Sequence, residues 1–149
     1  ASANQQTNYQ LNLSASGIGG ITTSRDPGET ASTALDLGVL TETPNTIEFN
    51  EFVGTSDLAD VYRFTTTEDG SFAGQVFNIS SSVRADIILD NNNNGIFEPE
   101  EILFSQIGNS SNPNIRLRSI PSETAVTFYV RITPETPDIR GTYSLGYRF

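Results

Sequence analysis

Residues 126 to 132 read Val-Thr-Phe-Tyr-Val-Arg-Ile, with apolar side chains at every second position. A period of two is typical of a β-strand that buries one face and exposes the other. Residues 143 to 149, Tyr-Ser-Leu-Gly-Tyr-Arg-Phe, show the same alternation at the C-terminus. Both segments therefore predict half-buried β-strands.

Weaker alternation recurs along most of the chain, in Ile47 to Val53, Val61 to Thr66, Phe72 to Ile79, Ala85 to Leu89, Ile102 to Ile107 and Ile115 to Ile120. Clusters of Gly, Asn, Ser, Pro and Asp separate these segments at intervals typical of antiparallel sandwiches. The only helical candidate is a turn near Glu29 to Leu35. We predict an all-β fold, an antiparallel β-sandwich, and 149 residues suit one such domain or one domain with a tail.

Between two of these strands, residues 90 to 101 match the twelve-residue calcium loop D-x-[DN]-x-[DN]-G-x5-E at every fixed position. The predicted metal ligands are side-chain oxygens of Asp90, Asn92, Asn94, Glu98 and Glu101, together with the main-chain carbonyl of Ile96. Gly95 stands where the loop turns sharply and needs a positive φ. Only three of these ligands are anionic, so we expect a weak affinity for Ca²⁺, on the order of 10⁻⁴ to 10⁻³ M, as in extracellular modules.

The same stretch is open to a second interpretation, an Asn-rich hairpin turn without metal, because Asn-Gly is a strong turn signal. The acids at Glu98 and Glu101 favour calcium, since a simple turn gains nothing from carboxylates at that spacing. Strands on either side leave no helices for the ion to move apart. We therefore expect structural calcium that stabilises a long hairpin, rather than a calcium sensor.

The composition excludes several kinds of catalytic site. The chain has no Cys and no His, and all its basic residues are Arg, so it cannot build a thiol nucleophile, a Ser-His-Asp triad or a Schiff-base lysine. Carboxylate pairs remain as weak acid–base candidates, namely Asp57 with Asp60, or Glu98 with Glu101. We expect a protein that is not an enzyme.

The formal net charge of -10 indicates which partners are disfavoured. Nucleic acids and anionic lipids would be repelled by such a surface, so we expect neither of them as a direct partner. No apolar run is long enough to span a bilayer. The chain begins Ala1-Ser2-Ala3, in the style of a processed end, and we expect a secreted or cell-surface protein.

Several stretches of this sequence together resemble a known family. They are Asp26 to Gly38, Phe52 to Phe64, Ala85 to Asp90, Phe128 to Ile132 and Gly141 to Leu145. In this order and spacing they resemble bacterial pre-peptidase C-terminal domains, particularly the versions repeated in cyanobacterial secreted proteins, from about residue 26 to residue 149. The resemblance implies a secreted β-sandwich, often an accessory module beside a peptidase, that binds calcium or surfaces and has no catalytic residues.

In that family an acidic turn precedes a Tyr-x-Phe strand, and here Asp57 and Asp60 precede Tyr62-Arg-Phe64. We interpret these two acids as residues for turn formation and solubility, in preference to a second ion site.

An N-terminal extension of residues 1 to 25 precedes the predicted domain of residues 26 to 149. Its residues 7 to 14 read Thr-Asn-Tyr-Gln-Leu-Asn-Leu-Ser and repeat the Tyr-x-Leu-x-apolar pattern of Tyr143 to Tyr147. A flexible connector of residues 16 to 20, Ser-Gly-Ile-Gly-Gly, follows. The strand, with Tyr9, Leu11 and Leu13 as its apolar positions, can join its own sheet, be the tail of a preceding domain, or pair with a neighbouring subunit.

The last explanation carries a function, because head-to-tail strand addition that does not close into a ring produces filaments. Our leading hypothesis is a secreted calcium-binding structural subunit that assembles with copies of itself through its N-terminal strand. The alternative is a non-catalytic accessory module that binds polysaccharide or protein substrate for a secreted enzyme system. Tyr129 is the clearest exposed aromatic candidate for such a binding surface.

Overall fold

The computed structural model describes residues 26–40, 47–67, 72–118 and 124–148. The predicted assembly residues Tyr9, Leu11 and Leu13 lie outside these ranges. Within them no helix is both long enough and apolar enough to cross a membrane.

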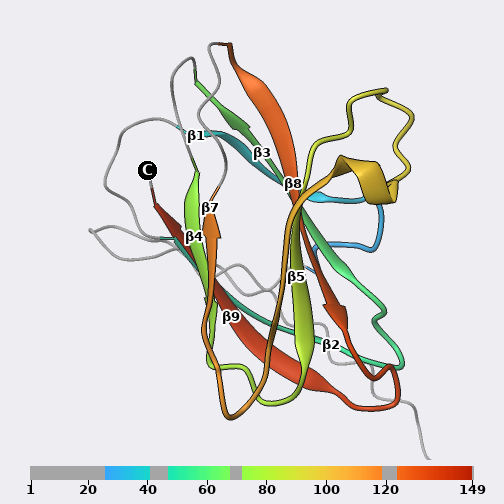
Figure 1. Ribbon diagram of the computed structural model, residues 1–149, viewed down its shortest axis with the longest axis vertical. Helices are drawn as coiled ribbons and strands as arrows, with labels where there is room; N and C mark the ends of the chain where they lie inside the picture. The colour runs from blue at the N-terminus through green and yellow to red at the C-terminus, as the bar shows by residue number, and fades with distance from the viewer. Residues whose placement is uncertain (1–25, 41–46, 68–71, 119–123, 149) are drawn as a thin grey trace, which may run out of the picture.

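In the described part of the chain, nine strands form two sheets (Figure 1). The strands are β1 (Leu35–Leu40), β2 (Ile47–Val53), β3 (Asp60–Thr66), β4 (Ala73–Phe77), β5 (Val83–Ile88), β6 (Ile102–Gly108), β7 (Ile115–Arg118), β8 (Val126–Pro134) and β9 (Gly141–Arg148). One sheet has the order β1-β3-β8-β5-β6 and the other has the order β2-β9-β4-β7. The predicted β-sandwich is confirmed, and all eight predicted strand segments form strands.

The N-terminal side of the domain differs from the prediction. The helical candidate near Glu29 to Leu35 is a single turn and no helix: Thr33 N–H donates to the Thr30 carbonyl at 3.2 Å, and Leu35 already begins β1. β1 pairs with β3 in parallel, whereas the other strand pairs in both sheets are antiparallel. Short-range alternation does not reveal this pairing, because the paired residues, such as Leu35 and Tyr62, are distant in sequence.

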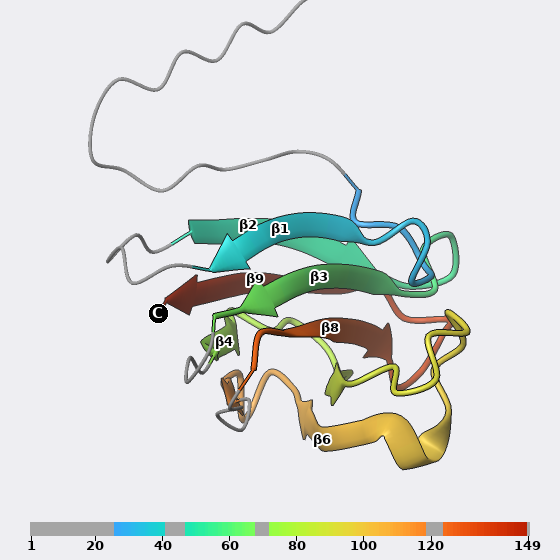
Figure 2. The same cartoon turned by 90° about the horizontal axis from the view of Figure 1, so that it is seen from above.

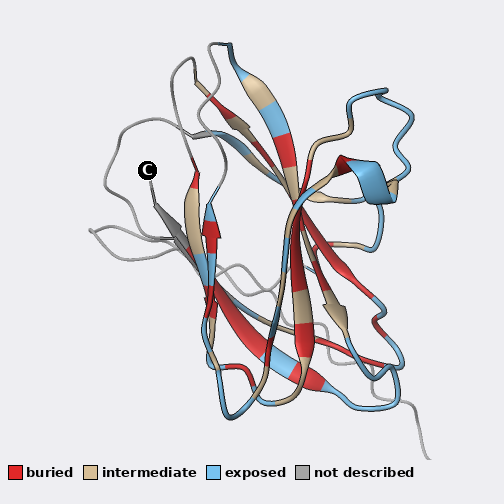
Figure 3. Ribbon diagram, viewed as in Figure 1, coloured by how far each residue is buried: buried red, intermediate tan, exposed pale blue. Residues whose placement is uncertain are grey.

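The core lies between the inward faces of the two sheets, and buried residues appear on strands of both (Figure 3). Phe64 is central to it, with its ring centroid 4.2 Å from that of Phe72 and 5.7 Å from that of Phe128. Because alternate residues of β3 share one face, the burial of Tyr62 and Phe64 also directs Asp60 inward. The strand that builds the core thereby carries a carboxylate into the interior.

Candidate metal centre

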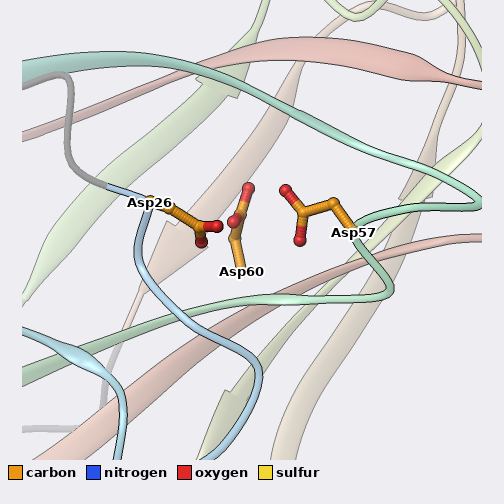
Figure 4. Close-up of side chains that lie close together, drawn as sticks. All are labelled: Asp26, Asp57 and Asp60. Carbon is orange, nitrogen blue, oxygen red and sulfur yellow. The ribbon is translucent and has the colours of Figure 1, made fainter.

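Three aspartates converge at the N-terminal end of β3. Asp26, Asp57 and Asp60 each bring a carboxylate oxygen within 4.8 Å of the others, and Figure 4 shows the three side chains pointing toward one another. Two oxygens that share one calcium ion lie at most about 5 Å apart, twice the usual Ca–O distance. The spacing of this aspartate cluster therefore fits a single divalent cation.

Asp26 is held in place by the short segment that precedes β1. Its Oδ1 accepts the Gly28 N–H at 2.9 Å, and the Gly28 carbonyl accepts the Val61 N–H at 2.8 Å, which fastens the segment to β3. Gly28 has a φ of 73°, and a Cβ at this position would lie 2.5 Å from the Thr33 carbonyl oxygen. The positive φ and this close approach both require glycine, so the sequence Asp26-Pro27-Gly28 fixes the position of the Asp26 carboxylate.

The other two aspartates come from the turn between β2 and β3 and from the start of β3. Asp57 closes the turn through its main chain, since its carbonyl accepts the Gly54 N–H at 2.6 Å. Its side chain is nearly buried, and Asp60 is fully buried. Of the two roles expected for these acids, turn formation is confirmed for Asp57, whereas solubility is wrong for both, because a carboxylate that serves solubility must face water.

Two tyrosines support Asp60 across the sandwich. The Tyr143 hydroxyl, on β9 of the opposite sheet, donates a hydrogen bond to Asp60 Oδ2. The Tyr62 hydroxyl lies 2.8 Å from the Tyr143 hydroxyl. Because the single Tyr143 proton goes to Asp60, Tyr62 is the donor of this second bond. The pair orients the carboxylate and links the two sheets.

The remaining oxygen of this carboxylate, Asp60 Oδ1, is buried and has no hydrogen-bond partner among the described residues. Burial raises the pKa of Asp60 to about 8, with a further contribution from the neighbouring charge of Asp57. Burial also raises the pKa of Asp57 to about 6, together with the charge of Asp26. Glu51, on β2, has its pKa raised by burial and by the charges of Asp26 and Asp57.

These observations fit a cation in the aspartate cluster. A buried unpaired carboxylate oxygen is costly unless a positive charge or a proton neutralises it. Carboxylate oxygens are the ligands that Ca²⁺ and Mg²⁺ prefer, and a site without nitrogen or sulfur ligands disfavours zinc. The same arrangement does not suit acid–base catalysis by Asp57 and Asp60, because a fully buried Asp60 cannot reach the reacting group of a substrate.

The predicted calcium loop, residues 90 to 101, joins the neighbouring antiparallel strands β5 and β6, as expected. Asp90 Oδ1 and Oδ2 accept the N–H groups of Asn94 at 3.2 Å and Gly95 at 2.9 Å. Asn92 Oδ1 accepts the Asn94 N–H at 2.9 Å, and Asn94 Oδ1 accepts the Ile96 N–H at 2.7 Å. Asp90, Asn92 and Asn94 thus turn their oxygens toward the inside of the loop.

The second half of the loop supplies Glu98 and Glu101. Glu98 Oε2 accepts a hydrogen bond from Asn92 Nδ2 at 2.8 Å. Glu101 is almost fully buried at the end of the short 3-10 helix Pro99–Glu101, and its carboxylate accepts the N–H groups of Asn91 at 2.9 Å and Glu98 at 3.3 Å. Unlike the aspartate cluster, the described acids of this loop, Asp90, Glu98, Glu100 and Glu101, include no three whose carboxylate oxygens lie within 4.8 Å of one another. Ile96, whose carbonyl is the remaining predicted ligand, is an exposed residue.

The loop is also packed onto the outer face of the larger sheet. Phe97 lies with its ring centroid 5.0 Å from that of Tyr129, and the Arg131 guanidinium lies 5.7 Å from the Phe97 ring centroid. Arg131 in turn forms an ion pair of 2.8 Å with the buried carboxylate of Asp86. Tyr129 is therefore partly covered by the loop, which disfavours it as an aromatic platform for a sugar.

The comparisons with known proteins give a likeness of fold and no match of sequence. No family model matches the sequence, and no curated protein matches it. Among solved structures, the fold is similar to the crystal structure at 1.0 Å of the pre-peptidase C-terminal domain of collagenase from Bacillus anthracis. The identity is 15%, the TM-score is 0.49, and the alignment covers 76% of this chain and 93% of that chain.

Proposed function

We propose that this protein is a non-catalytic β-sandwich module that works outside the cell and binds calcium at two places, the aspartate cluster and the loop of residues 90 to 101. The observation that carries the proposal is the buried Asp60 carboxylate, which lies beside those of Asp26 and Asp57 and whose Oδ1 has no hydrogen-bond partner among the described residues. The loop adds a sequence motif whose side-chain oxygens point inward. Extracellular calcium is concentrated enough to fill weak sites of this kind.

The two sites can be separated by the stoichiometry of calcium binding. We expect isothermal titration of the metal-free protein with CaCl₂ to give two equivalents, and one equivalent each for Asp57→Asn and Glu101→Gln. The double variant should bind none. Glu100→Gln is the matched control, because Glu100 lies in the same 3-10 turn but at no ligand position of the motif. Two equivalents in Asp57→Asn would refute the cluster, and an unchanged Glu101→Gln would leave the loop as a simple turn.

We further propose that the module is a structural subunit that assembles with copies of itself through residues 7 to 14. The support is the sequence likeness of this segment to β9, which pairs with β2 on one side and β4 on the other. A segment of that design is suited to pair with a strand edge.

Deletion of residues 1 to 20 tests the assembly. We expect the full chain to form large species in sedimentation velocity at high concentration, and the deletion variant to stay monomeric with an unchanged thermal midpoint. Electron microscopy of the full chain should show fibres. A full chain that remains monomeric at high concentration would contradict self-assembly and leave calcium binding unaffected.

A second candidate function, ligand binding as an accessory module, is favoured by one observation. A cavity of about 390 Å³ is lined by side chains of β2 and β9 together with Asn78 and Arg140. The Arg140 guanidinium lies 4.0 Å from the Phe52 ring centroid, and Ser144 Oγ donates to Asn50 Oδ1 at 2.6 Å. Such a mixture of an aromatic ring and polar groups suits a sugar or an extended peptide. A pull-down on insoluble polysaccharides and on collagen would test this function.

A further inference from the structure

The edges of the two sheets differ in how well they are protected against pairing with another chain. The four edge strands are β1, β2, β6 and β7. Natural edges are usually blocked by charged residues, by short length or by irregularities. Charged residues occur in three of these strands, namely Asp36 in β1, Glu48 and Glu51 in β2, and Arg116 and Arg118 in β7. β6, which reads Ile-Leu-Phe-Ser-Gln-Ile-Gly, contains none.

β6 also exposes apolar surface along that edge. Leu103 and Ile107 are 42% and 41% exposed, and Ser105 between them is exposed as well. The register with β5 shifts at Leu103, so the regular part of the edge runs from Phe104 to Gly108. Outside its ladder with β5, no backbone hydrogen bond from residues 103 to 107 to another described segment is present. This edge has backbone groups and apolar side chains available for a further strand.

The charge distribution indicates which segment can occupy the edge. All 18 acidic residues follow residue 25, whereas residues 1 to 25 contain one arginine and no acid. Two copies of the acidic domain repel each other, but the N-terminal segment can approach a second domain without that repulsion. Its apolar residues Tyr9, Leu11 and Leu13 stand at every second position, as do the exposed residues Leu103, Ser105 and Ile107 of β6. One face of the added strand would therefore cover the apolar side chains of Leu103 and Ile107.

The start of the described chain and the β6 edge lie on opposite sides of the domain, which favours a second copy as the source of the added strand. Figure 2 shows the start of the described chain, at residue 26, on the side of β1 and β2, and shows β6 on the opposite side of the molecule. A segment that leaves on one side and is received on the other generates a head-to-tail contact, which repeats instead of closing in a pair. We propose that β6 is the edge that receives residues 7 to 14 of a second copy of this chain. This inference rests on the assembly proposed above and names its acceptor.

The test compares two edges of the same sheet in the full-length protein. Ile107→Lys places a charge on β6, and Val39→Lys places the same charge on β1, where Val39 is 60% exposed. We expect the wild type and Val39→Lys to sediment as large species and Ile107→Lys to sediment as a monomer, with both variants folded by circular dichroism. Assembly of Ile107→Lys would overturn the inference while leaving self-assembly intact, and loss of assembly only in Val39→Lys would move the acceptor to β1.

A peptide of residues 5 to 16 provides a measurement that does not depend on filament growth. Added to the variant lacking residues 1 to 20, it should shift the amide resonances of residues 104 to 108 and slow their hydrogen exchange, and Ile107→Lys in that variant should abolish both effects. Shifts confined to β1, β2 or β7, or no shifts at millimolar peptide, would overturn the inference. If the variant lacking residues 1 to 20 itself assembles and Ile107→Lys prevents it, β6 pairs with β6 of another copy and the proposed occupant is wrong.

Discussion

Replacing Asp60 with Asn is expected to stabilise the calcium-free domain at pH 8 and to abolish its stabilisation by calcium at the aspartate cluster. Asn keeps an acceptor for the Tyr143 hydroxyl and removes the charge of a carboxylate that is fully buried beside Asp57. The buried charge is costly without a cation, so the metal-free protein gains stability when it is removed. The measurement is the thermal midpoint in EDTA and in CaCl₂.

The size of the calcium effect follows from mass action. At a calcium concentration of about 100 times the dissociation constant, one site stabilises the folded state by about 2.7 kcal/mol. In a domain of this size that corresponds to about 5 to 10 °C in the midpoint. The loop site contributes separately, so the comparison is best made in the Glu101→Gln background. We expect calcium to raise the thermal midpoint of Glu101→Gln by this full amount and to leave the midpoint of the Glu101→Gln, Asp60→Asn double variant unchanged.

Asp86→Asn is the matched control, because Asp86 is equally buried but has a positively charged partner. Its carboxylate accepts two hydrogen bonds from Arg131, at 3.1 and 2.8 Å, and one from Ser105 at 2.7 Å. Removing this charge leaves the Arg131 guanidinium without its counter-ion, so Asp86→Asn should destabilise the domain with and without calcium. An Asp60→Asn variant that is destabilised in EDTA in the same way would mean that Asp60 is a structural acceptor and not a metal ligand.

The strands were predictable because each buries one face, and the alternation of apolar and polar residues is a local property of the sequence. β8 and β9 show this best, since Val126, Phe128, Val130 and Ile132 in β8, and Tyr143 and Leu145 in β9, stand at every second position. β1 was missed because its alternation is short, its register with β3 shifts between Asp36 and Val39, and Val39 is exposed. Its parallel pairing with β3 is a long-range property that no window of sequence contains.

The aspartate cluster was missed for a similar reason. Asp26 is distant in sequence from Asp57 and Asp60, and it is brought to them by the contact between Gly28 and Val61 and by the pairing of β1 with β3. One local signal was present, because the alternation that buries Tyr62 and Phe64 also directs Asp60 inward. An acid on the apolar face of a core strand needs a partner, and that requirement could have pointed to the site. The loop of residues 90 to 101 was visible in the sequence because its ligands are contiguous.

The stability of the metal-free protein is expected to fall as the pH rises from 5 to 8, and calcium should remove or reverse this fall. Burial and neighbouring charges raise the pKa of Asp60 to about 8 and that of Asp57 to about 6, above the ordinary value of 3.8 that applies to the unfolded chain. A carboxyl group with a raised pKa in the folded state contributes fully below its unfolded pKa, and this contribution is lost as the pH rises through the folded pKa. Calcium binds the ionised carboxylates and competes with protons, so its stabilising effect should grow over the same interval.

Midpoints measured in EDTA and in CaCl₂ at pH 5, 6, 7 and 8 test this pH dependence. The Asp57→Asn, Asp60→Asn double variant is expected to lose most of the slope of midpoint against pH in EDTA. A midpoint in EDTA that stays level or rises from pH 5 to 8 would show that these carboxylates are neutralised by something other than protons or a metal ion.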